Sequence, residues 1–146
     1  MASLKKLLEK KAYVRIPLEM TETNHFALEV KVNGISGRFI LDTGASNTCI
    51  GFENIERFKL TSEASEIKAA GAGATNMDTL IATKNRIQIG TWQQKRCKIV
   101  LFDLVHVNEA LTTHNATPVD GIIGADVLEN AKAVIDYGKR KLYLKK

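Results

Sequence analysis

The sequence predicts a mostly β domain, folded as a compact closed barrel with one short helix near its C-terminal end. Short runs that alternate apolar and polar residues recur along the chain, which is typical of half-buried strands. Gly and Asn separate several of these runs, as expected for tight turns. The chain has 146 residues, of which 45% are hydrophobic, and this is enough for one core and one domain.

The N-terminal segment is expected to lead into the domain rather than to belong to it. Residues 1–12 are basic and read as a short helical or frayed lead-in. The domain itself is expected over residues 13–146. Its first strand is predicted at residues 13–16, which alternate apolar and polar side chains, and Pro17 ends it.

The next two strands form a predicted hairpin. Residues 26–32 alternate again, and residues 38–41 follow after Asn33-Gly34, a pair that tolerates the positive φ angles of a tight turn. The three residues that precede Asp42 are all apolar, which predicts a strand buried on both faces. We therefore expect Asp42 to emerge from a rigid core strand.

The middle of the chain is also predicted to be rich in strands. Residues 51–67 have a weaker pattern and are interpreted as a loop and a strand. Small residues at 69–74 favour a mobile hairpin tip. Residues 86–89 and 97–101 are predicted strands, joined through Gly90-Thr91.

The C-terminal part contains the predicted helix. A polar loop is expected at residues 112–118, and Gly121-Ile122-Ile123-Gly124 then leads into a helix over residues 125–132. Residues 133–137 and 141–144 make a closing hairpin.

The basic residues lie mostly at the two ends of the chain. The formal charge is +5, but residues 12–138 carry 12 basic and 15 acidic residues, a net charge of −3. The end segments hold 9 of the 21 basic residues: Lys5, Lys6, Lys10, Lys11, Lys139, Arg140, Lys141, Lys145 and Lys146. We interpret them as solvated tails and do not expect a nucleic-acid partner, since the only Trp, Trp92, lies in a stretch that reads as strand and not among basic residues on one face.

Cysteine and histidine usage predicts neither a disulfide framework nor a metal site. Two cysteines are too few for such a framework, so both are expected as free thiols. No metal-ligand spacing connects Cys49, Cys97, His25, His106 and His114.

The N-terminal lysines precede only Leu7-Leu8 and not a long apolar stretch, and no apolar run long enough to span a membrane follows. We expect a soluble, cytoplasmic protein without a membrane span.

Two loops carry a resemblance to a known family. Ile40 to Ser46 reads apolar-apolar-Asp-Thr-Gly-Ala-Ser, and Ile122-Ile123-Gly124 is apolar-apolar-Gly before a short helix. With a Gly-rich hairpin between them, these features resemble the retropepsin-type aspartic proteases over residues 26–144. The resemblance implies a retropepsin-like closed β-barrel, the acid protease fold, with one catalytic loop per monomer.

The number of acids then predicts a homodimer. Peptide hydrolysis needs one carboxylate to take a proton from water and a second group to protonate the carbonyl oxygen. In the family, one Asp-Thr-Gly per chain implies that a second copy supplies the other acid, and the two carboxylates share a proton. Asp120 and Asp126 are the rival acids within the chain, but a turn explains Asp120 and the first turn of a helix explains Asp126. We expect Asp42 of two copies to form the dyad.

The resemblance also implies roles for the neighbouring residues. Asp42, Thr43 and Gly44 are the expected catalytic residues, with Thr43 hydrogen-bonding across the dimer interface. The expected peptide-binding residues lie in the two loops and in a Gly-rich flap: Ala45, Ser46, Gly71, Ala72, Gly73, Ala74, Ile122, Ile123 and Gly124. The chain is predicted to be an aspartic endopeptidase that cleaves an extended peptide by water attack, without a cofactor.

Two other interpretations remain open. The same dimeric fold could be a catalytically silent module for peptide binding or dimerisation, because fold does not settle function. An unrelated barrel with a coincidental Asp-Thr-Gly turn would have to account for both loops.

Overall fold

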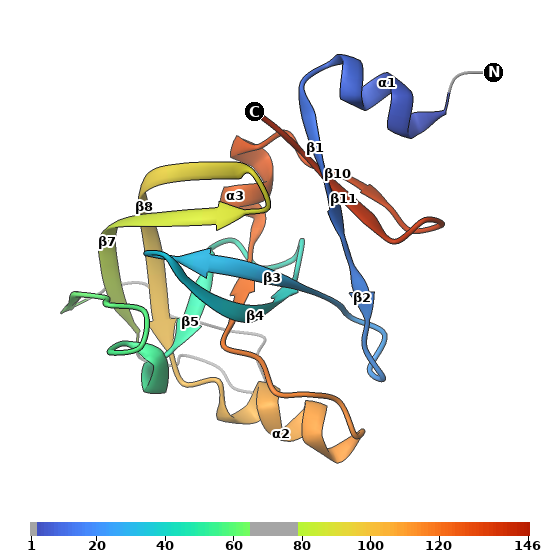
Figure 1. Cartoon of the computed structure of the whole chain (residues 1–146). Coiled ribbons are helices and arrows are strands. Elements are labelled where there is room, and N and C mark those ends of the chain that lie inside the picture. Colours follow the sequence, from blue (N-terminus) through green and yellow to red (C-terminus); the bar gives the residue numbers. More distant parts are fainter. Residues whose placement is uncertain (1–2, 65–78) are drawn as a thin grey trace.

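The computed structural model describes residues 3–64 and 79–146, and this part of the chain is mostly β (Figure 1). Six strands close into a barrel, because β7 pairs with β3 as well as with β8. In order around the barrel the strands are β3 (Phe26–Val32), β4 (Ile35–Leu41), β9 (Gly121–Ile123), β5 (Cys49–Gly51), β8 (Trp92–Phe102) and β7 (Leu80–Ile89). Two short strands extend the sheet, β2 (Glu19–Met20) beside β3 and β6 (Ser62–Ala64) beside β7. The predicted closed, mostly β barrel is confirmed.

The two ends of the chain form a second sheet beside the barrel. Its strand order is β1 (Tyr13–Pro17), β11 (Lys141–Lys145) and β10 (Val134–Asp136), all antiparallel. Tyr13 lies opposite Lys145, so the N-terminal and C-terminal segments run side by side (Figure 1). The closing hairpin was predicted, whereas its pairing with the first strand joins residues too distant in sequence for a local pattern to reveal.

Three helices accompany the strands in the described residues. Helix α1 (Leu4–Lys10) begins at Ser3, whose side chain accepts a hydrogen bond from the Lys6 N–H, and α3 (Ala125–Asn130) is the predicted helix. Helix α2 (Val105–Thr113) was not predicted, and it extends into the expected polar loop. Leu111 is its only fully buried residue, so its apolar pattern is too sparse to indicate a helix. A single 3₁₀ turn, η1 (Phe52–Asn54), follows β5.

The hairpin before Asp42 has the predicted form. Val32 lies opposite Ile35, and the turn between them has φ +52° at Asn33 and +86° at Gly34, where these two residue types are least strained. Phe39, Ile40 and Leu41 are 0%, 5% and 8% exposed, as the unbroken apolar run indicated. Asp42 therefore follows a strand that is held on both faces.

Strands β7 and β8 are longer than predicted. Their pairing is irregular on both sides of Asn85, and Lys84 has φ +61°, so the polar residues there bend the strand without ending it. Asn85 is 3% exposed and accepts a hydrogen bond from the Asn33 side chain at 3.0 Å. The hairpin tip predicted at residues 69–74 lies outside the described residues.

Candidate active site

Two parallel strands bring the predicted loops together. Strand β4 pairs with β9, with Leu41 opposite Ile123, so the segments after both strands leave the barrel side by side. The Asp42 N–H donates to the Ile123 carbonyl at 3.0 Å, and the Ala125 N–H donates to the Ala45 carbonyl at 2.7 Å. These bonds tie the loop of residues 42–48, here called the Asp42 loop, to the start of α3.

The Asp42 carboxylate is exposed and held by its own turn. The Gly44 N–H donates to Asp42 Oδ1 at 2.9 Å, and the Ala45 N–H donates to the Asp42 carbonyl at 3.2 Å. A Cβ on Gly44 would lie 3.3 Å from Asp42 Oδ1, a tight contact that glycine avoids. The exposed position leaves the carboxylate accessible to water and substrate.

A buried clamp joins the Asp42 loop to α3. Thr48 is fully buried; its hydroxyl donates to Asp126 Oδ1 at 2.8 Å and accepts from the Gly124 N–H at 3.0 Å. The Thr48 N–H also donates to Asp126 Oδ1, at 2.9 Å, and the Val127 N–H donates to the same oxygen at 2.8 Å. One carboxylate oxygen thus accepts three hydrogen bonds and fixes both loops relative to each other.

Gly124 is required by close packing. A Cβ at this position would lie 2.7 Å from the Ala45 carbonyl oxygen and from backbone atoms of Asn47. The preceding side chains, Ile122 and Ile123, are 7% and 0% exposed and support the loop from the core. Their predicted contact with a substrate stays a prediction.

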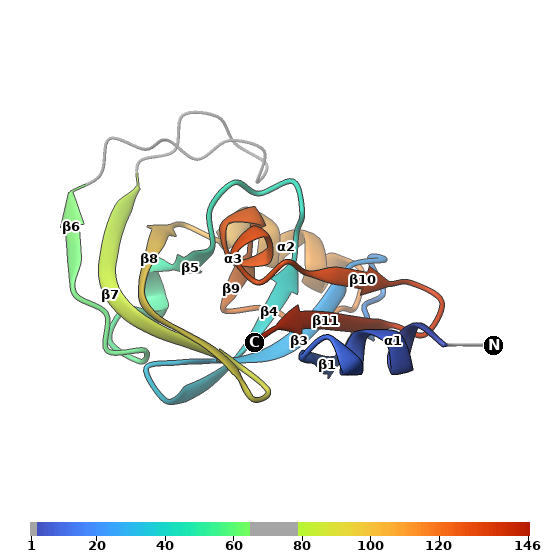
Figure 2. The ribbon, with the colours of Figure 1, turned by 90° about the horizontal axis from the view of Figure 1, so that it is seen from above.

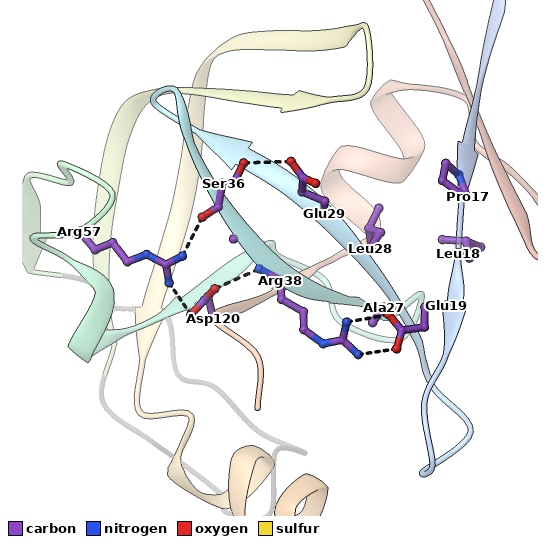
Figure 3. A pocket seen from close by; sticks show the side chains of 11 residues that line it. Pro17, Leu18, Glu19, Ala27, Leu28, Glu29, Ser36, Arg38, Arg57 and Asp120 are labelled. Atoms are coloured by element: carbon purple, nitrogen blue, oxygen red, sulfur yellow. Dashed lines mark hydrogen bonds and ion pairs between the residues drawn. The ribbon is translucent and has the colours of Figure 1, made fainter. Parts of the chain in front are cut away.

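The rival acids within the chain are both engaged elsewhere. Asp126 serves the buried clamp. Asp120 forms an ion pair with Arg57 at 2.8 Å and accepts from the Arg38 N–H at 3.0 Å (Figure 3). Asp120 precedes β9 and Gly124 follows β9, so the length of this strand, about 10 Å, separates Asp120 from the Asp42 loop.

Asp120 lines a cavity on the outer side of β3 and β4. This cavity has a volume of about 590 Å³, and the ion pair of Arg38 with Glu19, at 2.8 Å, lies across it (Figure 3). The Arg38 guanidinium lowers the pKa of the Glu19 carboxyl through hydrogen bonding and charge. The charged side chains that line the cavity are mostly paired with one another, and the cavity is separate from the Asp42 loop.

The remaining predicted site residues fall into two groups. Thr43 and Ser46 are exposed in the Asp42 loop, and Ala45 is half-buried. The predicted flap residues Gly71, Ala72, Gly73 and Ala74 lie outside the described residues. Thr48 was not predicted, because a single threonine after the motif carries no pattern and its partners lie about 80 residues further along the chain.

The cysteines do not offer a nucleophile. Both are buried free thiols, as predicted. Burial, reinforced by the charges of Asp126 and Asp42, raises the pKa of the Cys49 thiol to about 12, and burial raises the pKa of Cys97 to about 11. Since the thiolate is the reactive form, both groups are inert near neutral pH.

Metal-binding clusters and membrane-spanning helices are both absent from the described residues. Residues 3–64 and 79–146 contain no cluster of three or more His, Cys, Asp or Glu side chains placed to hold a metal ion. No helix in these same segments is long and apolar enough to cross a bilayer.

Comparisons with known proteins agree with the geometry. Residues 28–127 match the model of the aspartyl protease family. A sequence comparison with curated proteins finds no significant match.

Three solved structures share the fold. A retropepsin-like aspartic protease from Rickettsia conorii has a TM-score of 0.57 and 22% identity, over 90% of this chain and 87% of that one. The EIAV protease in complex with the inhibitor HBY-793 has a TM-score of 0.55 and 20% identity, over 75% of this chain and 90% of that one. The retroviral protease-like domain of Ddi1 from Leishmania major has a TM-score of 0.55 and 14% identity, over 81% and 86% of the two chains.

Proposed function

Because the chain belongs to the aspartyl protease family, we propose that it is an aspartic endopeptidase that works as a homodimer. Two Asp42 carboxylates, one from each copy, form the catalytic dyad. The observation that carries this proposal is the position of Asp42, exposed after a buried strand and held by the Gly44 N–H, while Asp120 and Asp126 are engaged in other contacts.

The chemistry of the dyad follows from sharing one proton. Two carboxylates a few ångströms apart cannot both ionise cheaply, so the pair carries one proton over a range of pH. The ionised Asp42 takes a proton from water, which attacks the peptide carbonyl, and the protonated Asp42 hydrogen-bonds to the carbonyl oxygen as it gains charge. The nitrogen of the resulting tetrahedral intermediate takes up the proton that the first Asp42 removed from water, and the C–N bond breaks. An acid and an amine then leave without a covalent enzyme intermediate, and the dyad again holds one proton.

The surroundings of Asp42 support this role in distinct ways. The turn to Gly44 orients one carboxylate oxygen, and the clamp of Thr48 and Asp126 fixes the loop that carries it. Thr43 is exposed within one copy, as needed for the proposed hydrogen bond to a partner. An extended peptide is the proposed substrate, with a homodimer as the active form.

Peptide cleavage by wild type and Asp42→Asn tests the proposal. Both proteins are incubated with a diverse peptide library from about pH 3 to 7, the range in which such a pair titrates. Asp136→Asn is a matched control, because this residue lies in β10 and its Oδ1 accepts the Lys139 N–H, a role that Asn can keep. We expect cleavage by wild type and by the control and none by Asp42→Asn.

The alternative outcomes are distinct. Cleavage by a folded Asp42→Asn would refute the mechanism. If wild type binds peptides but cleaves none at any pH or protein concentration, the chain is a silent binding module of the same fold.

A further inference from the structure

The fold brings lysines from three distant segments of the chain close together. The Lys146 N–H donates to the Ala12 carbonyl at 3.0 Å, which places it beside Lys11. The Lys145 N–H donates to the Ala131 carbonyl at 2.8 Å. Tyr13 lies opposite Lys145, and its hydroxyl donates to the Lys132 carbonyl at 2.8 Å. We call the exposed residues that meet here the terminal lysine cluster: Lys10, Lys11, Lys132, Lys145 and Lys146.

No ion pair in the part of the chain that the structure describes involves these five lysines. The ion pairs found in residues 3–64 and 79–146 join Arg38 to Glu19 and Arg57 to Asp120. Lys5 and Lys6 on α1 add two further exposed positive charges, and the nearby acids in sequence are Glu9 and Glu129. Like charges held together repel one another, and an anionic partner would relieve that repulsion.

The side chains around the cluster favour a lipid surface over a nucleic acid. Leu4 and Leu7 on α1 are 39% and 47% exposed beside the lysines. Lysine-rich helices with exposed leucines lie at membrane interfaces, where charge and apolar contact act together. Nucleic-acid surfaces rely more on arginine forks and on aromatic stacking, whereas the charges of this cluster are all lysines.

We propose that the terminal lysine cluster, with Leu4 and Leu7, binds the surface of membranes that contain anionic lipids. Helix α1 has seven residues and only two exposed leucines, so charge supplies most of the attraction and salt weakens it. The two views place α1 and the C-terminus apart from the loop that follows β4 (Figures 1 and 2).

Vesicle co-sedimentation tests this proposal independently of proteolysis. Wild type is mixed with phosphatidylcholine vesicles, or with vesicles in which about one third of the lipid is phosphatidylserine. We expect sedimentation only with the anionic vesicles and release at high salt. Since each lysine near an anionic surface contributes roughly fivefold to partitioning, replacing Lys10, Lys11, Lys145 and Lys146 with Gln should lower it by about two to three orders of magnitude.

A charge-matched variant separates the cluster from overall charge. Replacing four exposed lysines on the barrel with Gln removes the same charge and should change partitioning by less than about threefold: Lys31, Lys84, Lys95 and Lys98. Circular dichroism checks that both variants fold.

A second variant tests the leucines. Leu4→Ser with Leu7→Ser leaves the charge unchanged and should weaken binding several-fold.

Three results would overturn the proposal. One is sedimentation that does not depend on phosphatidylserine. Another is an equal loss of binding in both lysine variants. The third is tighter binding to duplex DNA or RNA than to anionic vesicles at the same salt concentration.

Discussion

Replacing Thr48 with Val should destabilise the fold strongly, although the two side chains have nearly the same shape. The Thr48 hydroxyl is fully buried, donates to Asp126 Oδ1 at 2.8 Å and accepts from the Gly124 N–H at 3.0 Å. The substitution removes a hydrogen bond to a charged acceptor, worth about 1.5–3 kcal/mol, and leaves the Gly124 N–H buried without a partner, at about 1–3 kcal/mol. Because the two effects share one group, we expect a loss of about 2–5 kcal/mol from a domain stability of roughly 5–15 kcal/mol.

Urea unfolding measures this loss. The variants are compared at one protein concentration, since the proposed dimer would make apparent stability depend on concentration. Thr48→Ser is the matched control, because it keeps the hydroxyl and removes a single methyl group, at about 1 kcal/mol. Two results would refute the reasoning: a Thr48→Val protein within about 0.5 kcal/mol of wild type, or equal losses for Val and Ser.

Three further predictions concern the same region. Gly124→Ala places a Cβ 2.7 Å from backbone atoms and should lower the free energy of unfolding in urea by about 1–3 kcal/mol. Gly138→Ala is the control, because its Cβ would lie 3.5 Å from Asp136 Oδ1, and it should cost less than about 0.5 kcal/mol. Equal costs for the two variants would contradict the packing argument. Burial raises the pKa of Cys49 from 9.0 to about 12, so alkylation of this thiol at pH 8, followed by mass spectrometry, should be at least about 100-fold slower in the folded protein than in urea. The contribution of the thiol to stability should also fall as the pH rises from about 9 towards 12. Similar alkylation rates in the folded protein and in urea would contradict this prediction. Asp126→Asn keeps an acceptor oxygen but removes the charge, so it should lower the pKa of Cys49 and speed alkylation of this thiol at about pH 9. It should also lower the free energy of unfolding by about 1 kcal/mol. An unchanged alkylation rate would show that Asp126 does not raise the pKa of Cys49.

Local patterns predicted the hairpin, whereas the two loops of the site were predicted from their resemblance to the loops of retropepsin-type aspartic proteases. Asn33-Gly34 fixes a turn within a few residues, and the apolar run before Asp42 depends on burial of a single strand. The structure gives a physical reason for the glycine in each loop, because a Cβ would lie 3.3 Å from Asp42 Oδ1 at Gly44 and 2.7 Å from backbone atoms at Gly124.

Contacts between distant segments could not be predicted in this way. Thr48 and Asp126 are 78 residues apart, and neither residue type alone indicates a clamp. The pairing of β1 with β11 joins the two chain ends, and helix α2 has too few buried residues for a helical pattern. The cytoplasmic location, the flap and the homodimer stay predictions.

A subunit-mixing experiment tests the central claim most directly. Wild type and Asp42→Asn are mixed in varying proportions, allowed to exchange subunits, and assayed for peptide cleavage at constant total protein. If a dyad needs one Asp42 from each copy, activity follows the square of the wild-type fraction, and an equimolar mixture retains about one quarter of the activity of wild type. A linear dependence, with about one half retained, would show that each chain acts alone and would contradict the shared dyad.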